Sequence, residues 1–136
     1  HVRMARHCEN GQAVAEFLAS HPKIAYVNYC GLPGDKYHAV AEKYLPNGSC
    51  GVVSFGVKGG REAAAAFMGH LKIAAIETHV ADARTCCLHP ASSTHRQMND
   101  EQLIAAGVQP DLVRMSCGLE DKNDLIHDIA QALDQI

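Results

Sequence analysis

The sequence contains no tryptophan, only 5% aromatic residues and no run of basic side chains along any segment. Proteins that bind nucleic acid or anionic membranes usually carry clustered lysine and arginine, and this chain has a net charge of -3. No apolar run approaches the roughly 20 residues that cross a bilayer, and the polar opening from His1 to Arg6 is unlike a signal peptide. We therefore expect no nucleic-acid partner and no membrane partner.

The six cysteines include no C-x-x-C pair and stand mostly inside apolar runs. A chain of 136 residues can bury a core without disulfides, so we expect reduced thiols and a cytoplasmic location. His79, Cys86, Cys87, His89 and His95 are close in sequence, but none of the recognised zinc-ligand spacings is present. We therefore predict no metal site.

Apolar periodicity predicts a mixture of helices and short strands within one domain. Strands are expected at Ile24–Tyr29, Cys50–Val57, Ile73–Ile76, Thr85–Leu88 and Leu112–Cys117. Helices are expected at both ends of the chain and at residues 36–44, 62–71 and 99–107. No βαβ rhythm runs through the chain, so we predict an α+β fold: a small, largely antiparallel sheet with helices packed on one face.

Arg114 is the first candidate for a binding residue because it interrupts a strand-like apolar run. Alternation places it on one face with Leu112 and Ser116, and a guanidinium amid such neighbours needs a partner. Its planar fork matches a carboxylate in two parallel hydrogen bonds. The alternatives are an ion pair with an acid of this chain, or an edge-strand arginine that reaches water.

The segment from His89 to His95 is a second, weaker candidate, since Pro90 and the hydroxyl residues after it favour a tight turn. Such a turn could bind a polar ligand or could satisfy its own hydrogen bonds. Lys58-Gly59-Gly60-Arg61 lacks the pattern of a phosphate loop and is explained more simply as a strand-to-helix turn. The pattern contains no complete set of catalytic residues.

Several motifs, taken in order along almost the whole chain, resemble one enzyme family. They are Arg6-His7-Cys8-Glu9-Asn10, Tyr29-x-Gly31-Leu32, Lys43-Tyr44-Leu45-Pro46, Ser54-Phe55-x-Val57-Lys58-Gly59-Gly60, Ala81-Asp82-Ala83-Arg84-Thr85, His89 to His95, and Leu112-Val113-Arg114-Met115-Ser116-x-Gly118-Leu119-Glu120. Together they resemble the C-terminal domain of the cystathionine synthase and lyase family, the pyridoxal-phosphate enzymes of Cys and Met metabolism. Within that family, Asp82 to Thr85 and Thr94 to Met98 look most like O-acetylhomoserine sulfhydrylases.

The resemblance implies that residues 1–136 are a substrate-positioning C-terminal domain of a fold-type I enzyme. The pyridoxal phosphate would be bound by an N-terminal domain absent from this chain, because no lysine here resembles the family's Ser-x-Thr-Lys site. The intact enzyme is expected to be a homotetramer that replaces the acetate of O-acetyl-L-homoserine by sulfide or a thiol, giving homocysteine or methionine. The isolated domain is expected to be inactive.

The resemblance also implies a set of substrate-binding residues. Arg114 matches the position that pairs with the substrate α-carboxylate. Thr94 matches a loop position that holds Arg114 or the substrate. His79 matches a position that contacts the substrate carboxylate and is often Ser or Asn in relatives, and here a backbone N–H could make that contact. Thr78 falls where some lyases carry Glu and is expected to form a polar wall near the leaving group, while Ser92 is a weaker candidate.

Two alternatives remain at this stage. The same domain occurs in methionine or cystathionine γ-lyases and in cystathionine γ-synthases, although the lyases more often carry an acid where Arg84 stands. The alternative of another class is a free-standing, non-enzymatic module that binds a small ligand.

Overall fold

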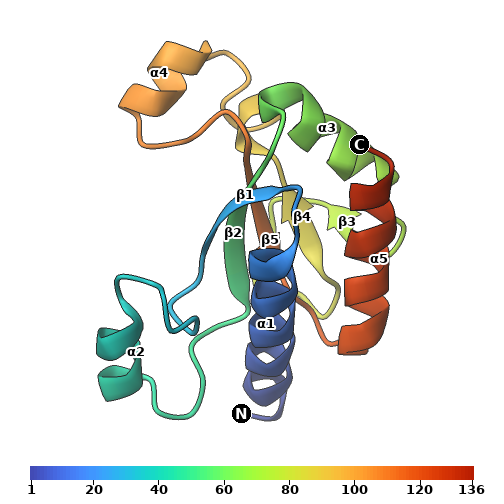
Figure 1. Ribbon diagram of the computed structural model, residues 1–136. Coiled ribbons are helices and arrows are strands. Elements are labelled where there is room, and N and C mark those ends of the chain that lie inside the picture. The colour runs from blue at the N-terminus through green and yellow to red at the C-terminus, as the bar shows by residue number, and fades with distance from the viewer.

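The computed structural model describes residues 1–136 and contains a five-stranded sheet covered on one side by helices (Figure 1). The strands are β1 (Ile24–Asn28), β2 (Val52–Val57), β3 (Ala75–Ile76), β4 (Cys86–Leu88) and β5 (Leu112–Ser116). Their order across the sheet is β1-β2-β5-β4-β3, and every pair is antiparallel except β3 with β4. The predicted α+β class and largely antiparallel sheet are confirmed.

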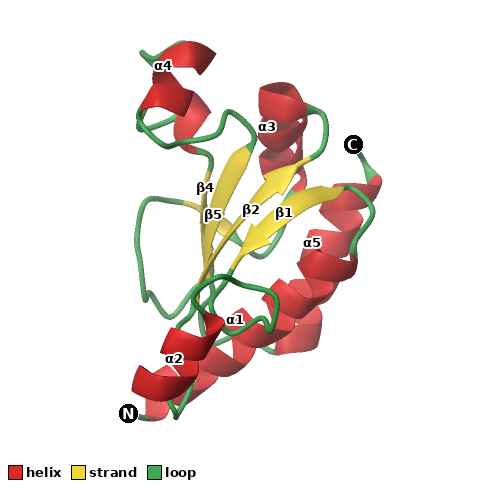
Figure 2. Ribbon diagram, turned by 60° about the vertical axis from the view of Figure 1, so that its left-hand side comes forward, coloured by secondary structure: helices red, strands yellow, loops and turns green.

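The helices are α1 (Val2–Ser20), α2 (His38–Tyr44), α3 (Gly60–His70), α4 (Asp100–Ala105) and α5 (Lys122–Asp134), with a 3-10 turn η1 (Pro90–Ser92). The three long helices α1, α3 and α5 cover one face of the sheet, whereas the short α2 and α4 lie beyond its two ends (Figure 2). None of these helices has the length and apolar character that a membrane crossing needs.

The core fills the space between the sheet and the three long helices. It is a cluster of 20 buried residues, in which Phe55 of β2 meets Phe67 of α3 edge to face with ring centroids 5.8 Å apart. Along β5 the alternation sends Val113 and Met115 into this cluster and turns Arg114 toward the opposite face. The face that carries Arg114 has no helix packed on it.

Local side-chain contacts set where several elements begin. Gly59 and Gly60 have φ values of 105° and 73°, a left-handed conformation that lets the chain reverse from β2 into α3. Asn99 and Gln102 form a reciprocal capping box at the start of α4. Asp121 caps α5 by accepting a hydrogen bond from the Asn123 amide at 2.8 Å.

The β3 strand is shorter than predicted because a buried carboxylate takes the backbone donors that precede it. Asp128 of α5, only 4% exposed, accepts hydrogen bonds from the amides of Lys72, Ile73 and Ala74 at 2.8, 2.9 and 3.0 Å. Those amides are thereby unavailable to a neighbouring strand, and pairing starts at Ala75. Asp128 thus connects the segment that follows α3 to α5.

The six cysteines are all free. Cys86, Cys87 and Cys117 are buried, and the other three are half-buried. Burial raises the pKa of Cys117 to about 12, so that its thiol stays protonated at neutral pH.

Replacing Asp128 by alanine should lower the free energy of unfolding by about 2–4 kcal/mol, because three backbone donors lose their acceptor. Urea unfolding followed by circular dichroism measures this change. Asp134→Ala, at the exposed end of the same helix, is the matched control and should stay within about 0.5 kcal/mol of the parent. Equal losses in the two variants would contradict the role given to Asp128.

Candidate substrate-binding groove

Arg114 stands in the middle of the sheet, on the face that no helix covers. Its cross-strand partners are Ser54 of β2 and Leu88 of β4, one on each side. Because β5 is an interior strand, the edge-strand alternative for Arg114 does not apply. The side chain therefore rises from a rigid, hydrogen-bonded position on the sheet.

The guanidinium of Arg114 is held by backbone carbonyls and by no acid of this chain. Its Nη2 donates to the carbonyl oxygen of Thr78 at 2.7 Å and more weakly to that of His79 at 3.4 Å. No carboxylate oxygen lies within 4.0 Å of it, and its buried Nε has no acceptor. An uncompensated, partly buried cation with unused donors is suited to an incoming carboxylate.

A groove of about 500 Å³ surrounds this guanidinium on the open face of the sheet. Its lining residues are Val52, Ser54, Thr78, Leu88, Pro90, Thr94, His95, Leu112 and Arg114. The strand residues Val52, Leu88 and Leu112 lie on the same face of the sheet as Arg114, and Ser54 is its direct cross-strand neighbour. Ser54 Oγ accepts a hydrogen bond from Asn28 Nδ2 at 3.3 Å, which leaves the Ser54 hydroxyl proton free to be donated. This combination is typical of a site for a small polar ligand.

The loop between β3 and β4 forms one wall of the groove and crosses the sheet near Arg114. The Ala81 amide donates to Ser116 Oγ at 2.9 Å, and Arg3 Nη2 donates to the Ala81 carbonyl. At the far end of the loop, the Thr85 amide and hydroxyl both donate to Glu120, at 2.6 and 2.8 Å. These anchors fix the Thr78 carbonyl that orients Arg114.

The opposite wall is the turn from His89 to His95, which is built on a buried histidine. His89 Nδ1 lies 2.9 Å from Ser92 Oγ, and Nε2 lies 2.9 Å from the Pro110 carbonyl. A carbonyl can only accept, so Nε2 carries the proton and Nδ1 accepts from the serine hydroxyl. From α3, Arg61 Nη1 donates to the Ala91 carbonyl at 2.6 Å. The turn is thus fixed from both sides.

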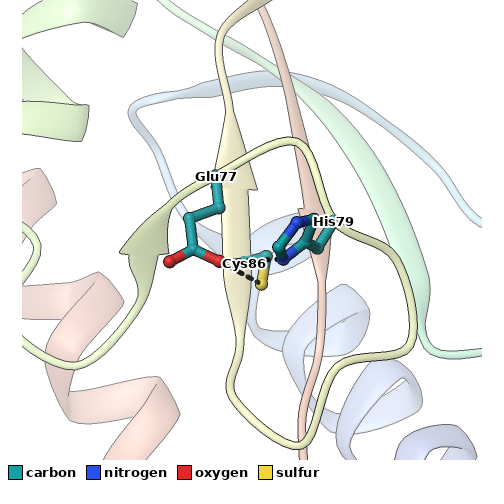
Figure 3. Close-up of side chains that lie close together, drawn as sticks. All are labelled: Glu77, His79 and Cys86. Carbon is teal, nitrogen blue, oxygen red and sulfur yellow. Dashed lines mark hydrogen bonds and ion pairs between the residues drawn. The ribbon is translucent and has the colours of Figure 1, made fainter.

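The structure brings together three of the five residues that the sequence nominated. Thr78, Thr94 and Arg114 line one groove. His79 is not among the residues that line the groove: its Nδ1 lies 3.1 Å from Glu77 Oε2 (Figure 3), and its carbonyl oxygen lies 3.4 Å from Arg114 Nη2. Ser92 does not line the groove, and its hydroxyl is hydrogen-bonded to His89.

Sequence reasoning missed Ser54 as a polar residue of the groove, and as a binding candidate it named His95 only as the last residue of the candidate turn. Ser54 could have been placed on the Arg114 face by alternation within its strand, but the pairing of β2 with β5 carries no local signal. Thr94 Oγ1 and His95 Nδ1 lie 2.9 Å apart, which joins this histidine to the predicted threonine.

The groove offers no amine that could bind the aldehyde of pyridoxal phosphate. None of the lysines lines it. Lys23 Nζ donates to the carbonyls of Leu133 and Ile136, Lys58 Nζ donates to that of Pro22, and Lys122 pairs with Glu9. The groove therefore offers a cation and hydroxyl groups that suit a carboxylate, and it offers no amine for the aldehyde of the cofactor.

Comparison with known proteins identifies the family. The family model for Cys/Met metabolism PLP-dependent enzymes matches residues 1–134 of the chain. The chain is 44% identical over 133 residues to a homocysteine synthase of Schizosaccharomyces pombe, and 45% identical over 136 residues to an O-acetyl-L-homoserine sulfhydrylase of Leptospira meyeri. It is also 41% identical over 135 residues to an L-methionine gamma-lyase of Fusobacterium nucleatum subsp. polymorphum. The chain therefore belongs to the family of Cys/Met metabolism PLP-dependent enzymes.

A solved structure agrees with this assignment. A putative O-acetylhomoserine (thiol)-lyase from Campylobacter jejuni, whose crystal structure contains N'-pyridoxyl-lysine-5'-monophosphate, superposes with a TM-score of 0.89 at 37% identity and covers 98% of this chain. The chain spans about a third of its relatives' length: 31% of the two sulfur-transfer enzymes, 34% of the lyase and 32% of the crystallised chain.

The buried His89 should make the stability of the chain depend on pH. Burial lowers its pKa below the ordinary value of 6.5, and the Pro110 carbonyl opposes this effect only in part. Below about pH 6.5 the unfolded chain then binds more protons than the folded chain, so the free energy of unfolding should decrease as pH falls toward the folded-state pKa. His89→Gln keeps a donor for Pro110 but cannot titrate, and should flatten this decrease in urea unfolding.

The matched control is His127→Gln, which removes an exposed histidine of α5 and should retain the pH slope of the parent. If the free energy of unfolding changed equally with pH in His89→Gln and in the parent between about pH 5 and about pH 7.5, the neutral His89 would not be the source of the pH dependence.

Proposed function

We propose that this chain is the C-terminal, substrate-positioning domain of a pyridoxal-phosphate-dependent O-acetylhomoserine sulfhydrylase. The intact enzyme replaces the acetate of O-acetyl-L-homoserine by sulfide or a thiol, and gives homocysteine or methionine. The observation that carries the proposal is Arg114, a cation without an acid partner that rises into a groove on the open face of the sheet. The family membership supplies the kind of ligand, an amino acid.

In this proposal Arg114 binds the substrate α-carboxylate through its unused donors. The Thr78 carbonyl fixes the plane of the guanidinium, so little reorganisation is needed when the substrate enters. The hydroxyls of Ser54 and Thr94 line the same groove and can donate to the carboxylate or to the polar tail of the substrate. Pyridoxal phosphate, when bound by the intact enzyme, withdraws electrons from the substrate amino acid, and this domain sets the substrate's orientation.

The cofactor is proposed to be held by an N-terminal domain, because no lysine of this chain lies in the groove. The domain alone is therefore expected to be inactive. The six free thiols fit a reducing, cytoplasmic environment, and the family resemblance favours a homotetramer for the intact enzyme.

The assignment to a sulfhydrylase rests on the names of similar proteins and on Arg84. The two relatives at 44% and 45% identity act in homocysteine synthesis by name, which favours γ-replacement. Arg84 stands where lyases more often carry an acid. A methionine or cystathionine γ-lyase is the second candidate, supported by the relative at 41% identity named as a methionine gamma-lyase.

Removing the Arg114 guanidinium from the intact enzyme should weaken substrate binding. Arg114→Ala should raise KM for O-acetyl-L-homoserine and lower kcat/KM by about 30- to 1000-fold, corresponding to about 2–4 kcal/mol for one charge-assisted pair. Arg114→Lys should recover only part of this loss, because an ammonium cannot form two parallel hydrogen bonds. Steady-state kinetics with varied O-acetyl-L-homoserine measure both variants.

The control is Arg6→Ala, which removes an exposed arginine whose partner is Glu9 on the same helix. Its kinetics should match those of the parent enzyme. Near-normal KM and kcat/KM in either Arg114 variant would remove this residue from the substrate site.

The nucleophile requirement separates the two candidate reactions. A sulfhydrylase should release homocysteine from O-acetyl-L-homoserine only when sulfide is supplied, whereas a γ-lyase should release 2-oxobutanoate from methionine or cystathionine without any added nucleophile. Product analysis of the intact enzyme with sulfide, with cysteine and with neither decides between them. Rapid 2-oxobutanoate release from methionine would contradict the sulfhydrylase assignment.

A further inference from the structure

Three side chains with different metal-binding atoms converge where the loop after β3 meets β4 (Figure 3). Glu77 and His79 belong to the loop that follows β3, and Cys86 begins β4. His79 Nδ1 lies 3.1 Å from Glu77 Oε2, and Cys86 Sγ lies 3.9 Å from the same oxygen. All three atoms lie within 4.8 Å of one another.

Arg84 holds the carboxylates around this cluster in a suitable orientation. Its Nη2 pairs with Glu77 Oε1 at 2.8 Å, which leaves Oε2 facing His79. Its backbone amide pairs with Asp82 Oδ1 at 2.9 Å, which leaves Asp82 Oδ2 3.8 Å from His79 Nδ1. In protein metal sites, outer hydrogen bonds of this kind orient the ligating carboxylates.

The spacing of the three atoms is close to that of a tetrahedral zinc site. Zinc binds oxygen and nitrogen at about 2.0–2.2 Å and sulfur at about 2.3 Å, so that neighbouring ligand atoms lie roughly 3.3–3.8 Å apart. The two contacts of Glu77 already fall near this range. The imidazole of His79 is 65% exposed, so a small movement of this side chain can close the remaining distance to Cys86.

We propose that Glu77, His79 and Cys86 bind a single zinc ion, with Asp82 or a water molecule as the fourth ligand. Binding releases the Cys86 thiol proton to solvent and uses the unprotonated Nδ1 of His79. The mixture of one sulfur, one nitrogen and one or two oxygens suits zinc better than magnesium or calcium, which prefer oxygen alone.

Zinc at this place ties the loop after β3 to the first residue of β4. The same loop carries the carbonyls of Thr78 and His79 that orient Arg114. Occupancy of the zinc site is therefore expected to reduce the mobility of the wall that positions the substrate carboxylate. This consequence rests on the proposed function, whereas the zinc site itself does not.

The test is zinc binding by the intact holoenzyme, which is separate from any activity assay. After dialysis against micromolar free zinc, we expect one zinc per chain by elemental analysis, and a zinc X-ray absorption spectrum with one sulfur at about 2.3 Å. His79→Asn and Cys86→Ser should each lose this ion and the sulfur signal. Because His79 is exposed, its variant is expected to fold even if the buried Cys86 variant does not.

Cys30→Ser is the matched control, since Cys30 is a half-buried thiol that follows β1, at the opposite edge of the sheet from β3 and β4. It should retain one zinc per chain. Failure of the parent to retain zinc, or retention by His79→Asn equal to the parent, would overturn the proposal. Hydrogen exchange of residues 77–81 with and without zinc then tests the link to Arg114, and unchanged exchange would remove that link.

Discussion

The structure depends on one constraint, which is that no acid of the chain neutralises the charge of Arg114. Arg114 projects from an interior strand, and two backbone carbonyls supply its contacts. Carbonyl dipoles offset only part of the desolvation of a guanidinium, and the buried Nε has no acceptor at all. Arg114 is thus a cation to which no acid of the chain is paired, and it retains unused donors.

The rest of the fold keeps that cation in place. The cluster of 20 buried residues lies between the sheet and the long helices, and the groove lies on the other side of the sheet. The loop after β3 is held in its middle, at Ala81, by Ser116 and at its end, at Thr85, by Glu120, and its Thr78 carbonyl accepts a hydrogen bond from Arg114. Arg61 of α3 reaches around to fix the opposite wall at Ala91. Contacts between residues distant in sequence therefore determine the shape of the groove.

The sequence predicted those features that follow from local pattern. Alternation within residues 112–117 placed Arg114 on one face of the strand and Val113 and Met115 on the other, and the helix and strand spans came close to those observed. The contacts that complete the groove join residues 35 or 36 positions apart in sequence, and no periodicity encodes such pairings. His79 and Cys86 were noted as neighbours in sequence, whereas Glu77, only two residues from His79, was not, because the pairing of β3 with β4 brings it to Cys86.

The most direct measurement of the central claim is a double-mutant cycle between Arg114 and the substrate carboxylate in the intact enzyme. The parent and Arg114→Ala are each compared with O-acetyl-L-homoserine and with its α-amide, which has no charge at that position. If the two groups pair, the parent enzyme should have a much lower kcat/KM for the amide than for O-acetyl-L-homoserine. Arg114→Ala should show little difference between the two substrates, so the losses from the mutation and from the amide do not add. Fully additive losses would contradict a direct contact between Arg114 and the carboxylate.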